Sequence, residues 1–211
     1  KITKANVAKI LKSYQAVLVP GGFGSRGIEG MIFACEFARK NKLPYFGICL
    51  GMQIAIIEFS RNVLKLKNAN STEFNIKTKY PVIGLVTEWK DASGKIEHRD
   101  ENSNLGGTMR LGGQKCLVKR NSLSHKLYKK LTITERHRHR YEVNPEYKNE
   151  LIAGGMDIVG TSLDGNLAEM IEIKKHPWFL GCQFHPEFTS NPRDGHPIFN
   201  DFIAKAIKIK R

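Results

Sequence analysis

The chain has 211 residues, of which 41% are hydrophobic, and it carries a formal net charge of +14. This length fits one domain with a sizeable core. No apolar run approaches the ~20 residues of a membrane helix, and the polar N-terminal sequence excludes a secretion signal, so we expect a cytoplasmic protein with no membrane partner.

Helices and apolar strands alternate through the first third of the chain. Apolar residues recur at helical spacing from Val7 to Tyr14 and from Ile28 to Cys35, whereas short continuous apolar runs indicate buried strands. The expected elements are a helix at residues 7–14, a strand at 16–20, a helix beginning at 28, a strand at 43–48 and a helix from 50 to about 61. This alternation predicts an α/β fold with a largely parallel open sheet and helices on both faces.

The middle and the end of the chain are less regular. Residues 81–87 predict a strand, and the charged, glycine-rich residues 98–113 predict a loop. Asp164, Gly165 and Asn166 supply a turn between two predicted strands, so we expect a small antiparallel hairpin there. The elements expected in the last third are strands at residues 158–162, 167–173 and 178–184 and a helix at 197–209.

The positive charge would suit a nucleotide, an acidic partner domain or a solvated surface. The lysines are spread along the chain, and no basic stretch is interleaved with aromatic residues. Nucleic acid is therefore not an expected partner.

The stretch from Gly47 to Gly51 places Cys49 between two glycines, where a predicted strand gives way to a predicted helix. This is the spacing of a nucleophile elbow, a tight turn that holds its central residue in a strained backbone. Side chains two positions away would collide across the turn, which explains both glycines. A helix N-terminus would also favour the thiolate. The alternative is a buried cysteine beside incidental glycines, since short patterns recur by chance.

The other cysteines offer no comparable pattern. Cys35, Cys116 and Cys182 form no CxxC pair with one another or with Cys49, so we expect neither a metal site nor a disulfide framework. They are interpreted as small buried hydrophobic residues. Cys49 is the one cysteine for which we expect chemistry.

A base for this thiol is suggested by Gln183-Phe184-His185-Pro186-Glu187, which follows a predicted strand. Residues two apart in a strand point to the same face, so Glu187 can orient the imidazole of His185 and stabilise its charged form. Ligands gather at the carboxyl ends of strands in open α/β sheets, which favours this histidine over the other six. A surface histidine with a chance acidic neighbour is the alternative.

A third candidate is the turn from Pro20 to Gly24, which also follows a predicted strand. Glycine-rich turns of this kind present backbone N–H groups that can receive a developing oxyanion. The sequence is not the G-x-x-x-x-G-K-[ST] pattern of a phosphate-binding loop. An ordinary glycine turn is the remaining alternative.

Taken in order, PGGFG, GICLGMQ and QFHPE resemble the class I (triad) glutamine amidotransferase domain, a flavodoxin-like fold. With PGGFGSRGIEG, ANSTEF, GGTMRLG, ERHRHRYEVN and QFHPEF, the sequence is similar more narrowly to the C-terminal glutaminase domain of the CTP synthase family. The resemblance covers essentially all 211 residues. GGTMRLG and RHRHRYEVN carry the narrower assignment, because the other motifs specify only the class.

The resemblance implies that Cys49 attacks the amide of L-glutamine to form a thioester, with His185 moving protons and Glu187 holding His185. It implies ammonia transfer to a UTP that ATP has activated. The implied oxyanion hole is the N–H groups of Gly22 and Leu50. The remaining implied glutamine contacts are Gly51, Met52, Gln53, Glu73 (toward the substrate ammonium) and Arg140.

The resemblance also implies partners. We expect the synthetase domain of the same chain upstream, where ATP and magnesium would bind, no cofactor or metal within residues 1–211, and a homo-oligomer, a tetramer in the full-length family. GTP is the expected effector, with Arg99 in the effector-responsive loop. Because the sequence begins with a helix, we expect the domain's first strand to be missing and the sequence to be a segment of a longer protein.

Two other functions stay open. One is an amidotransferase subunit of another biosynthetic pathway, against which GGTMRLG argues. The other is a noncatalytic regulatory module, against which Cys49, His185 and Glu187 argue. After HPEF, Asn191, Asp194 and Gly195 stand where basic residues are expected, which weakens the expected contact with the synthetase domain. Apart from Arg140, the basic residues of ERHRHR are interpreted as a solvated strand edge.

Overall fold

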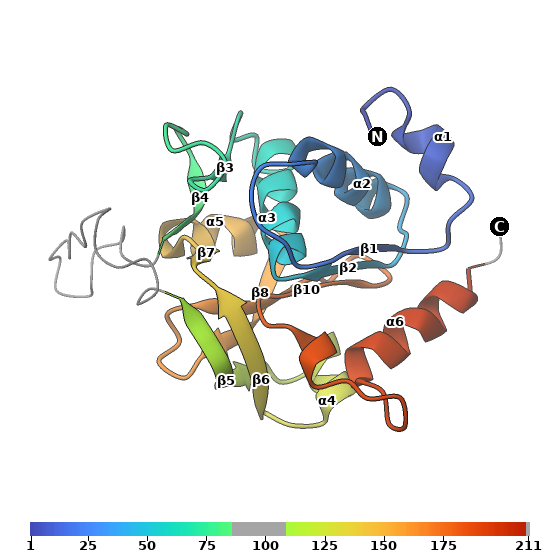
Figure 1. The fold of residues 1–211 in the computed structure, drawn as a ribbon, viewed down its shortest axis with the longest axis vertical. Helices are drawn as coiled ribbons and strands as arrows, with labels where there is room; N and C mark the ends of the chain where they lie inside the picture. Colours follow the sequence, from blue (N-terminus) through green and yellow to red (C-terminus); the bar gives the residue numbers. More distant parts are fainter. Residues whose placement is uncertain (86–108, 210–211) are drawn as a thin grey trace, which may run out of the picture.

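The computed structural model describes residues 1–85 and 109–209 as a central sheet with helices on both faces and a smaller second sheet at one side (Figure 1). No helix in these residues is long and apolar enough to cross a membrane. The helices are α1 (Val7–Leu11), α2 (Ile28–Lys40), α3 (Leu50–Asn62), α4 (Leu123–Tyr128), α5 (Lys148–Gly154) and α6 (Pro197–Ile207), with short 3-10 turns η3 (Pro145–Tyr147) and η4 (Pro186–Phe188). The strands are β1 (Val17–Val19), β2 (Tyr45–Ile48), β3 (Asn70–Ser71), β4 (Pro81–Leu85), β5 (Arg110–Val118), β6 (Thr132–His139), β7 (Tyr141–Val143), β8 (Met156–Ser162), β9 (Ala168–Ile173) and β10 (Phe179–Cys182).

The main sheet has the strand order β1-β2-β10-β9-β8-β5-β6. The first three strands are parallel, with Val19 beside Gly47 and Gly181 also beside Gly47. Helix α2 connects β1 to β2 as a crossover between parallel strands, and α3 leaves β2 to cover the same face. This confirms the expected α/β fold with helices on both faces of an open sheet.

The antiparallel part of the main sheet is larger than a single hairpin. The expected β8–β9 hairpin is present, with Gly165 at φ 76° in its turn. In addition, β10 pairs antiparallel with β9, β5 pairs with β8, and β6 pairs with β5. Short turns join β8 to β9 and β9 to β10, and the short helix α4 lies between β5 and β6. Such connections are enough for antiparallel pairing but too short for parallel crossovers.

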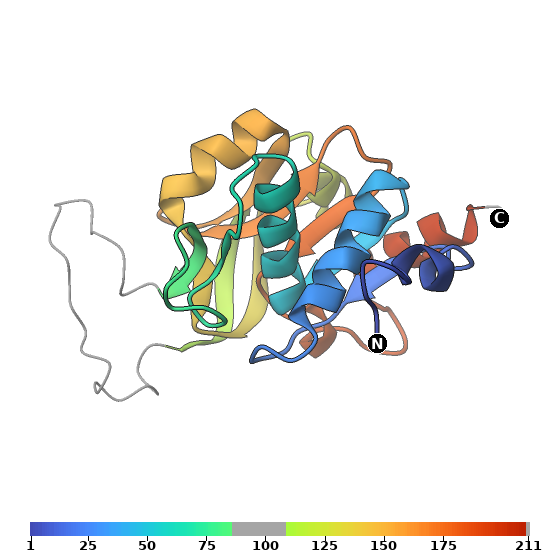
Figure 2. The same cartoon turned by 90° about the horizontal axis from the view of Figure 1, so that it is seen from above.

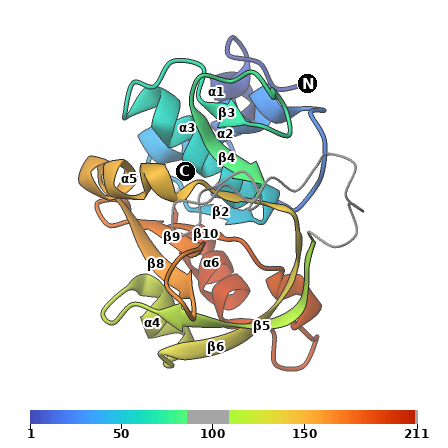
Figure 3. The same cartoon turned by 90° about the vertical axis from the view of Figure 1, so that its left-hand side faces the viewer.

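Helices α2 and α3 lie on one face of the main sheet and α4 and α6 on the other (Figures 1 and 3), and a hydrophobic cluster lies on each side. The first gathers α2, α3 and Leu151 of α5, and it also holds the second sheet, β3-β4-β7, in place. The second is covered by α6 and α4 and is rich in aromatic residues, with Phe46, Trp178 and Phe202 in mutual contact. Figure 2 shows α2 and α3 running side by side over the sheet. Strands β2 and β10, which lie between these helical layers, end at Ile48 and Cys182.

Several predicted boundaries are corrected. The first helix ends at Leu11, before Tyr14, and the last ends at Ile207. The predicted loop at 98–113 is wrong for its last four residues, because Arg110–Val118 is strand β5, held by β6 along its length. Residues 86–87 of the predicted strand 81–87 lie outside the described residues.

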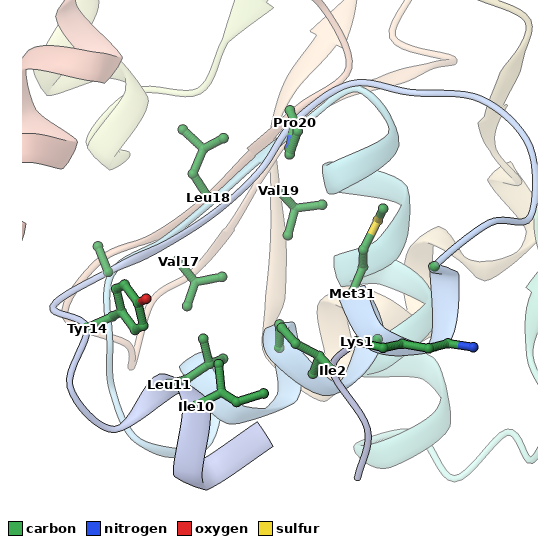
Figure 4. A pocket seen from close by; sticks show the side chains of 14 residues that line it. Lys1, Ile2, Ile10, Leu11, Tyr14, Val17, Leu18, Val19, Pro20 and Met31 are labelled. Atoms are coloured by element: carbon green, nitrogen blue, oxygen red, sulfur yellow. The ribbon is translucent and has the colours of Figure 1, made fainter. Parts of the chain in front are cut away.

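An apolar cavity of about 550 Å³ lies between α1, α2 and β1, the terminal strand of the sheet (Figure 4). Leu18, Val19, Ile10 and Met31 line it. Its lining has no cysteine, histidine or carboxylate, so this cavity lacks the chemistry predicted for the active site.

Candidate active site

Cys49 occupies the sharp turn between β2 and α3, with φ 50° and ψ −102°. Residues with a Cβ rarely adopt this backbone conformation, so the turn is strained and must be held by its surroundings. The N–H of Cys49 donates to the carbonyl of Cys182 at the end of β10 at 2.7 Å. The predicted elbow is therefore present, and a neighbouring strand fixes it.

The two flanking glycines are required for different reasons. A Cβ on Gly47 would lie 2.5 Å from the carbonyl carbon and oxygen of Gly51, which is the predicted collision across the turn. A Cβ on Gly51 would instead lie 2.1 Å from the carbonyl oxygen of Val19 in β1. The second glycine thus lets the first turn of α3 approach the neighbouring strand.

His185 lies directly after β10 and is held at three points. Its N–H donates to the carbonyl of Arg136 at 2.8 Å, its Nδ1 lies 2.6 Å from Oε1 of Glu187, and its ring stacks on Phe188 with centroids 4.9 Å apart. Nε2 is buried and has no partner among the described residues. When Nδ1 donates to Glu187, the neutral ring presents Nε2 as a proton acceptor.

The glycine-rich turn brings Cys49 and His185 together. A Cβ on Gly21 would lie 2.6 Å from Cε1 of His185 and 3.7 Å from Cβ of Cys49. Both side chains therefore flank the same point, and only glycine leaves room for the imidazole there. The three motifs that are far apart in the sequence meet at one place.

The expectation that the helix N-terminus favours the thiolate of Cys49 is wrong. The residue is buried, and burial raises the pKa of its thiol to about 12. The N–H of Leu50 acts in the opposite direction, while the carboxylates of Glu142, Glu187 and Glu73 raise the pKa further. The thiol therefore keeps its proton at neutral pH until a base removes it.

Gly22 and Leu50, the predicted oxyanion donors, are neighbours. A Cβ on Gly22 would lie 3.1 Å from Cδ2 of Leu50. Leu50 is the first residue of α3, and the N–H groups of a helix's first turn have no acceptor within the helix. Both residues lie beside Cys49, because Leu50 follows it in the chain and Gly22 lines a cavity that Cys49 also lines.

A cavity of about 350 Å³ opens in front of Cys49. It contains five predicted site residues, Gly22, Cys49, Gln53, Glu73 and Arg140, together with Phe23, Met109, Arg138, His139 and Tyr141. Leu50, Gly51 and Met52 do not line it, and the Met52 side chain is buried in the core. Any contact of Gly51 or Met52 with glutamine would therefore have to come from their backbone groups.

Glu73 and Gln53 are already oriented by hydrogen bonds at this cavity. Oε1 of Glu73 accepts the N–H of Gly24 at 2.8 Å. Burial raises the pKa of Glu73, and the Gly24 N–H partly offsets this. Nε2 of Gln53 donates to the carbonyl of Tyr141 at 2.9 Å, so Gln53 holds the cavity wall as well as lining the cavity.

The largest omission from the sequence reading is a buried ionic cluster behind the cavity. Arg110 forms ion pairs with Glu142 at 2.8 Å and Glu169 at 2.7 Å, and His139 lies 2.7 Å from Glu142. Burial and the charge of Arg110 lower the pKa of His137 to about 2. The interpretation of ERHRHR as a solvated edge is therefore wrong for these histidines. Burial alternates along β6, and a period of two in that run could have revealed its inner face.

The remaining predictions concern Arg99, metal binding and the other three cysteines. Arg99 lies outside the described residues, so its role stays a prediction. Within the part of the chain that is described, no group of three or more His, Cys, Asp or Glu side chains could hold a metal ion. Cys35, Cys116 and Cys182 are fully buried, as the sequence predicted.

Comparisons with known proteins agree with this geometry. The family model for glutamine amidotransferase class-I matches residues 1–205. The glutaminase domain of the Trypanosoma brucei CTP synthase, solved with bound acivicin, is 37% identical over 98% of this chain and 76% of that chain, with a TM-score of 0.85. A structure from Thermoplasma acidophilum, described as a GMP synthase candidate, is 16% identical over 98% of this chain and 80% of its own, with a TM-score of 0.56, and shares the fold alone.

Proposed function

Because this chain belongs to the class-I glutamine amidotransferase family, we propose that it hydrolyses the side-chain amide of L-glutamine and supplies the ammonia for amination of UTP to CTP. The observation that carries the proposal is that Cys49 and the His185–Glu187 pair meet at Gly21, while Cys49 and Gly22 also line a cavity that holds Glu73 and Arg140. The narrower assignment is supported by the similarity to a CTP synthase glutaminase domain, which was solved with acivicin, a glutamine analogue.

In the proposed first step, Sγ of Cys49 attacks the carboxamide carbon of glutamine while its proton passes to Nε2 of His185. The raised pKa of Cys49 makes this transfer necessary, since little thiolate exists at neutral pH. The unpartnered Nε2 suits this role, and Glu187 at Nδ1 stabilises the imidazolium that results. The carbonyl oxygen becomes an oxyanion that the N–H groups of Gly22 and Leu50 would receive.

Collapse of this intermediate breaks the carbon–nitrogen bond. His185 gives its proton to the departing nitrogen, ammonia leaves, and a glutamyl thioester remains on Cys49. His185, now neutral, takes a proton from water, whose oxygen attacks the thioester carbon. Collapse releases glutamate and returns the proton to the sulfur, so the enzyme is regenerated with no net change.

Glutamine carries an ammonium and a carboxylate on its α-carbon, so its site needs a negative group for the first and a positive group for the second. Glu73 is the carboxylate in the cavity that would pair with the ammonium, and Arg140 is a guanidinium there that would face the carboxylate. A cavity of about 350 Å³ suits a ligand of this size. ATP and magnesium in a synthetase domain and stimulation by GTP remain predictions.

The test uses the full-length protein, in which the predicted synthetase domain is joined to this domain. With UTP, ATP and glutamine, CTP formation is expected in the native protein and should be lost in Cys49→Ser. With ammonium chloride in place of glutamine, both proteins should form CTP. Release of glutamate from glutamine, with no CTP formed from either glutamine or ammonium chloride, would instead indicate an amidotransferase of another pathway.

A further inference from the structure

The turn that carries His185 and Glu187 is fastened to β6 through a buried carboxylate. Oγ1 of Thr189 donates to Oε2 of Glu135 at 3.0 Å and lies 3.2 Å from the carbonyl of Pro186. One hydroxyl thus joins both ends of the short η4 turn and connects them to β6. Glu135 lies in the segment that the sequence suggested was a solvated edge, yet its side chain is only 4% exposed.

Glu135 is itself held rigidly. Its Oε1 accepts the hydroxyl of Tyr128 at 2.8 Å and lies 2.9 Å from Nε2 of His196, the residue before α6. Burial and the Glu135 charge raise the pKa of Tyr128, so the phenol keeps its proton and remains a donor. The carboxylate therefore joins α4, the start of α6 and the η4 turn at one point.

The same strand also holds the other end of the turn. The N–H of His185 donates to the carbonyl of Arg136, the residue after Glu135. Two adjacent residues of β6 thus fix the backbone of His185 and the side chain of Thr189. Between these two anchors lie Glu187, which contacts Nδ1, and Phe188, which stacks on the ring.

Glu187 needs such support because its own side chain is 40% exposed. A carboxylate in contact with water can adopt several rotamers, and the 2.6 Å contact with His185 persists only if the backbone beneath it is fixed. From these contacts we infer that Glu135 and Thr189 are positioning residues, which hold Glu187 and Phe188 against His185 so that Nε2 faces Cys49. This inference rests on the proposed function for its kinetic effect.

The test compares Thr189→Val with Thr189→Ser. Valine keeps the β-branched shape and removes the hydroxyl, whereas serine keeps the hydroxyl. Thr189 lies at the surface, so neither change threatens the fold. We expect Thr189→Val to lower kcat roughly tenfold, below the hundredfold that a misplacement of about 1 Å can cost, with KM for glutamine within about twofold. Thr189→Ser should restore kcat to within about twofold of the native value.

Ser124→Ala is the matched control. Ser124 also donates its hydroxyl to a buried carboxylate, Oε1 of Glu172 at 2.6 Å, but in α4 and away from the catalytic turn. If loss of such a hydrogen bond acts only through stability, Ser124→Ala and Thr189→Val should lower kcat alike. The inference predicts that Ser124→Ala keeps kcat within about twofold while lowering the melting temperature.

A second readout does not depend on activity. The imidazole ¹⁵N shifts of His185 report which ring nitrogen carries the hydrogen, and the native protein should show the Nδ1–H form that Glu187 selects. Thr189→Val should move these shifts toward a mixture of tautomers, and Thr189→Ser should not. Unchanged shifts in Thr189→Val would overturn the inference. If the native protein released no glutamate, the proposed function would fail, while these shifts would still decide whether the turn is held in this way.

Discussion

The two halves of the main sheet contribute different things to the site. The parallel half, β1, β2 and β10 with α2 and α3, supplies Cys49 on a turn made possible by close backbone packing at glycines. The antiparallel half, β9, β8, β5 and β6, supplies the buried charges of Arg110 and Glu169 behind the cavity at Cys49 and that of Glu135 beneath the histidine turn. The parallel half thus holds Cys49 through close backbone packing, and the antiparallel half holds the residues around Cys49 through charge and hydrogen bonding.

Each half contains a buried arginine–glutamate contact, which makes the comparison direct. In the parallel half, Arg39 of α2 binds Glu58 of α3 through two hydrogen bonds of 2.7 and 2.6 Å. In the antiparallel half, Arg110 of β5 bridges Glu169 of β9 and Glu142 of β7, a strand of the second sheet. The arginines are similarly buried, with side chains 17% and 16% exposed, and all three carboxylates are fully buried. Only the second contact touches the cavity, through His139.

The largest expected effect comes from the parallel half. Cys49→Ala removes the nucleophile while leaving the strained turn and its hydrogen bonds in place. We expect glutamate release to fall at least about a thousandfold, because the remaining groups cannot form the thioester. Steady-state assays measure this, and circular dichroism checks the fold. Activity within about tenfold of the native protein would show that another residue carries the reaction.

Arg110 and Arg39 differ in whether their loss should affect the cavity as well as stability. Arg110→Met and Arg39→Met should each lower the free energy of unfolding by about 3 kcal/mol, since each leaves a buried carboxylate without its partner. Arg110→Met should also raise KM for glutamine by about fivefold or more, because Glu142 then no longer orients His139 and the cavity wall. Arg39→Met should leave KM within about twofold. Denaturant unfolding and initial rates give both quantities, and an equal change in KM for the two variants would contradict the division between the halves.

The raised pKa of Cys49 predicts a pH dependence of alkylation. Burial disfavours the thiolate, so below a pKa of about 12 the thiolate fraction should rise tenfold for each unit of pH. The rate of reaction of Cys49 with iodoacetamide should therefore increase about a hundredfold from pH 7 to pH 9 without reaching a plateau. A rate that is already constant in this range would mean that the elbow alone holds a thiolate.

A further prediction concerns substrate recognition. Glu73→Gln keeps an oxygen for the Gly24 N–H but removes the negative charge that would face the substrate ammonium. A charged hydrogen bond is worth about 1.5–3 kcal/mol, which corresponds to a rise in KM of roughly ten- to a hundredfold with a smaller change in kcat. An unchanged KM in initial-rate measurements would remove Glu73 from the glutamine site.

The sequence predicted the parallel half well because its signals are local. The elbow depends on the glycines at positions 47 and 51 around Cys49, and the helices show clear apolar periodicity. In the antiparallel half the β8–β9 hairpin was predicted, but β5 and β6 were missed, because the inward-facing residues of β6 are mostly charged or polar. Along β6 the buried positions are Ile133, Glu135, His137 and His139, so hydrophobicity alone does not reveal the alternation.

Two other features could not be foreseen for a related reason. Arg110 follows two glycines in a polar stretch that resembles a loop, and its place in β5 depends on pairing with β6 more than twenty residues away. The pKa of Cys49 depends on burial by segments distant in the sequence, including the glycine turn at Gly21 and the histidine turn. The local sequence showed that Cys49 precedes a helix N-terminus, which lowers a thiol pKa. Only the tertiary structure shows that burial raises the pKa of Cys49 by more.

The most direct test of the account is capture of the covalent intermediate. The native protein would be mixed with glutamine, quenched in acid within its first turnover and digested, and the four cysteines would be compared by mass spectrometry. A glutamyl adduct is expected on the peptide that contains Cys49, and no such adduct is expected in Cys49→Ser. An adduct on Cys35, Cys116 or Cys182, or glutamate release with no adduct on any cysteine, would contradict it.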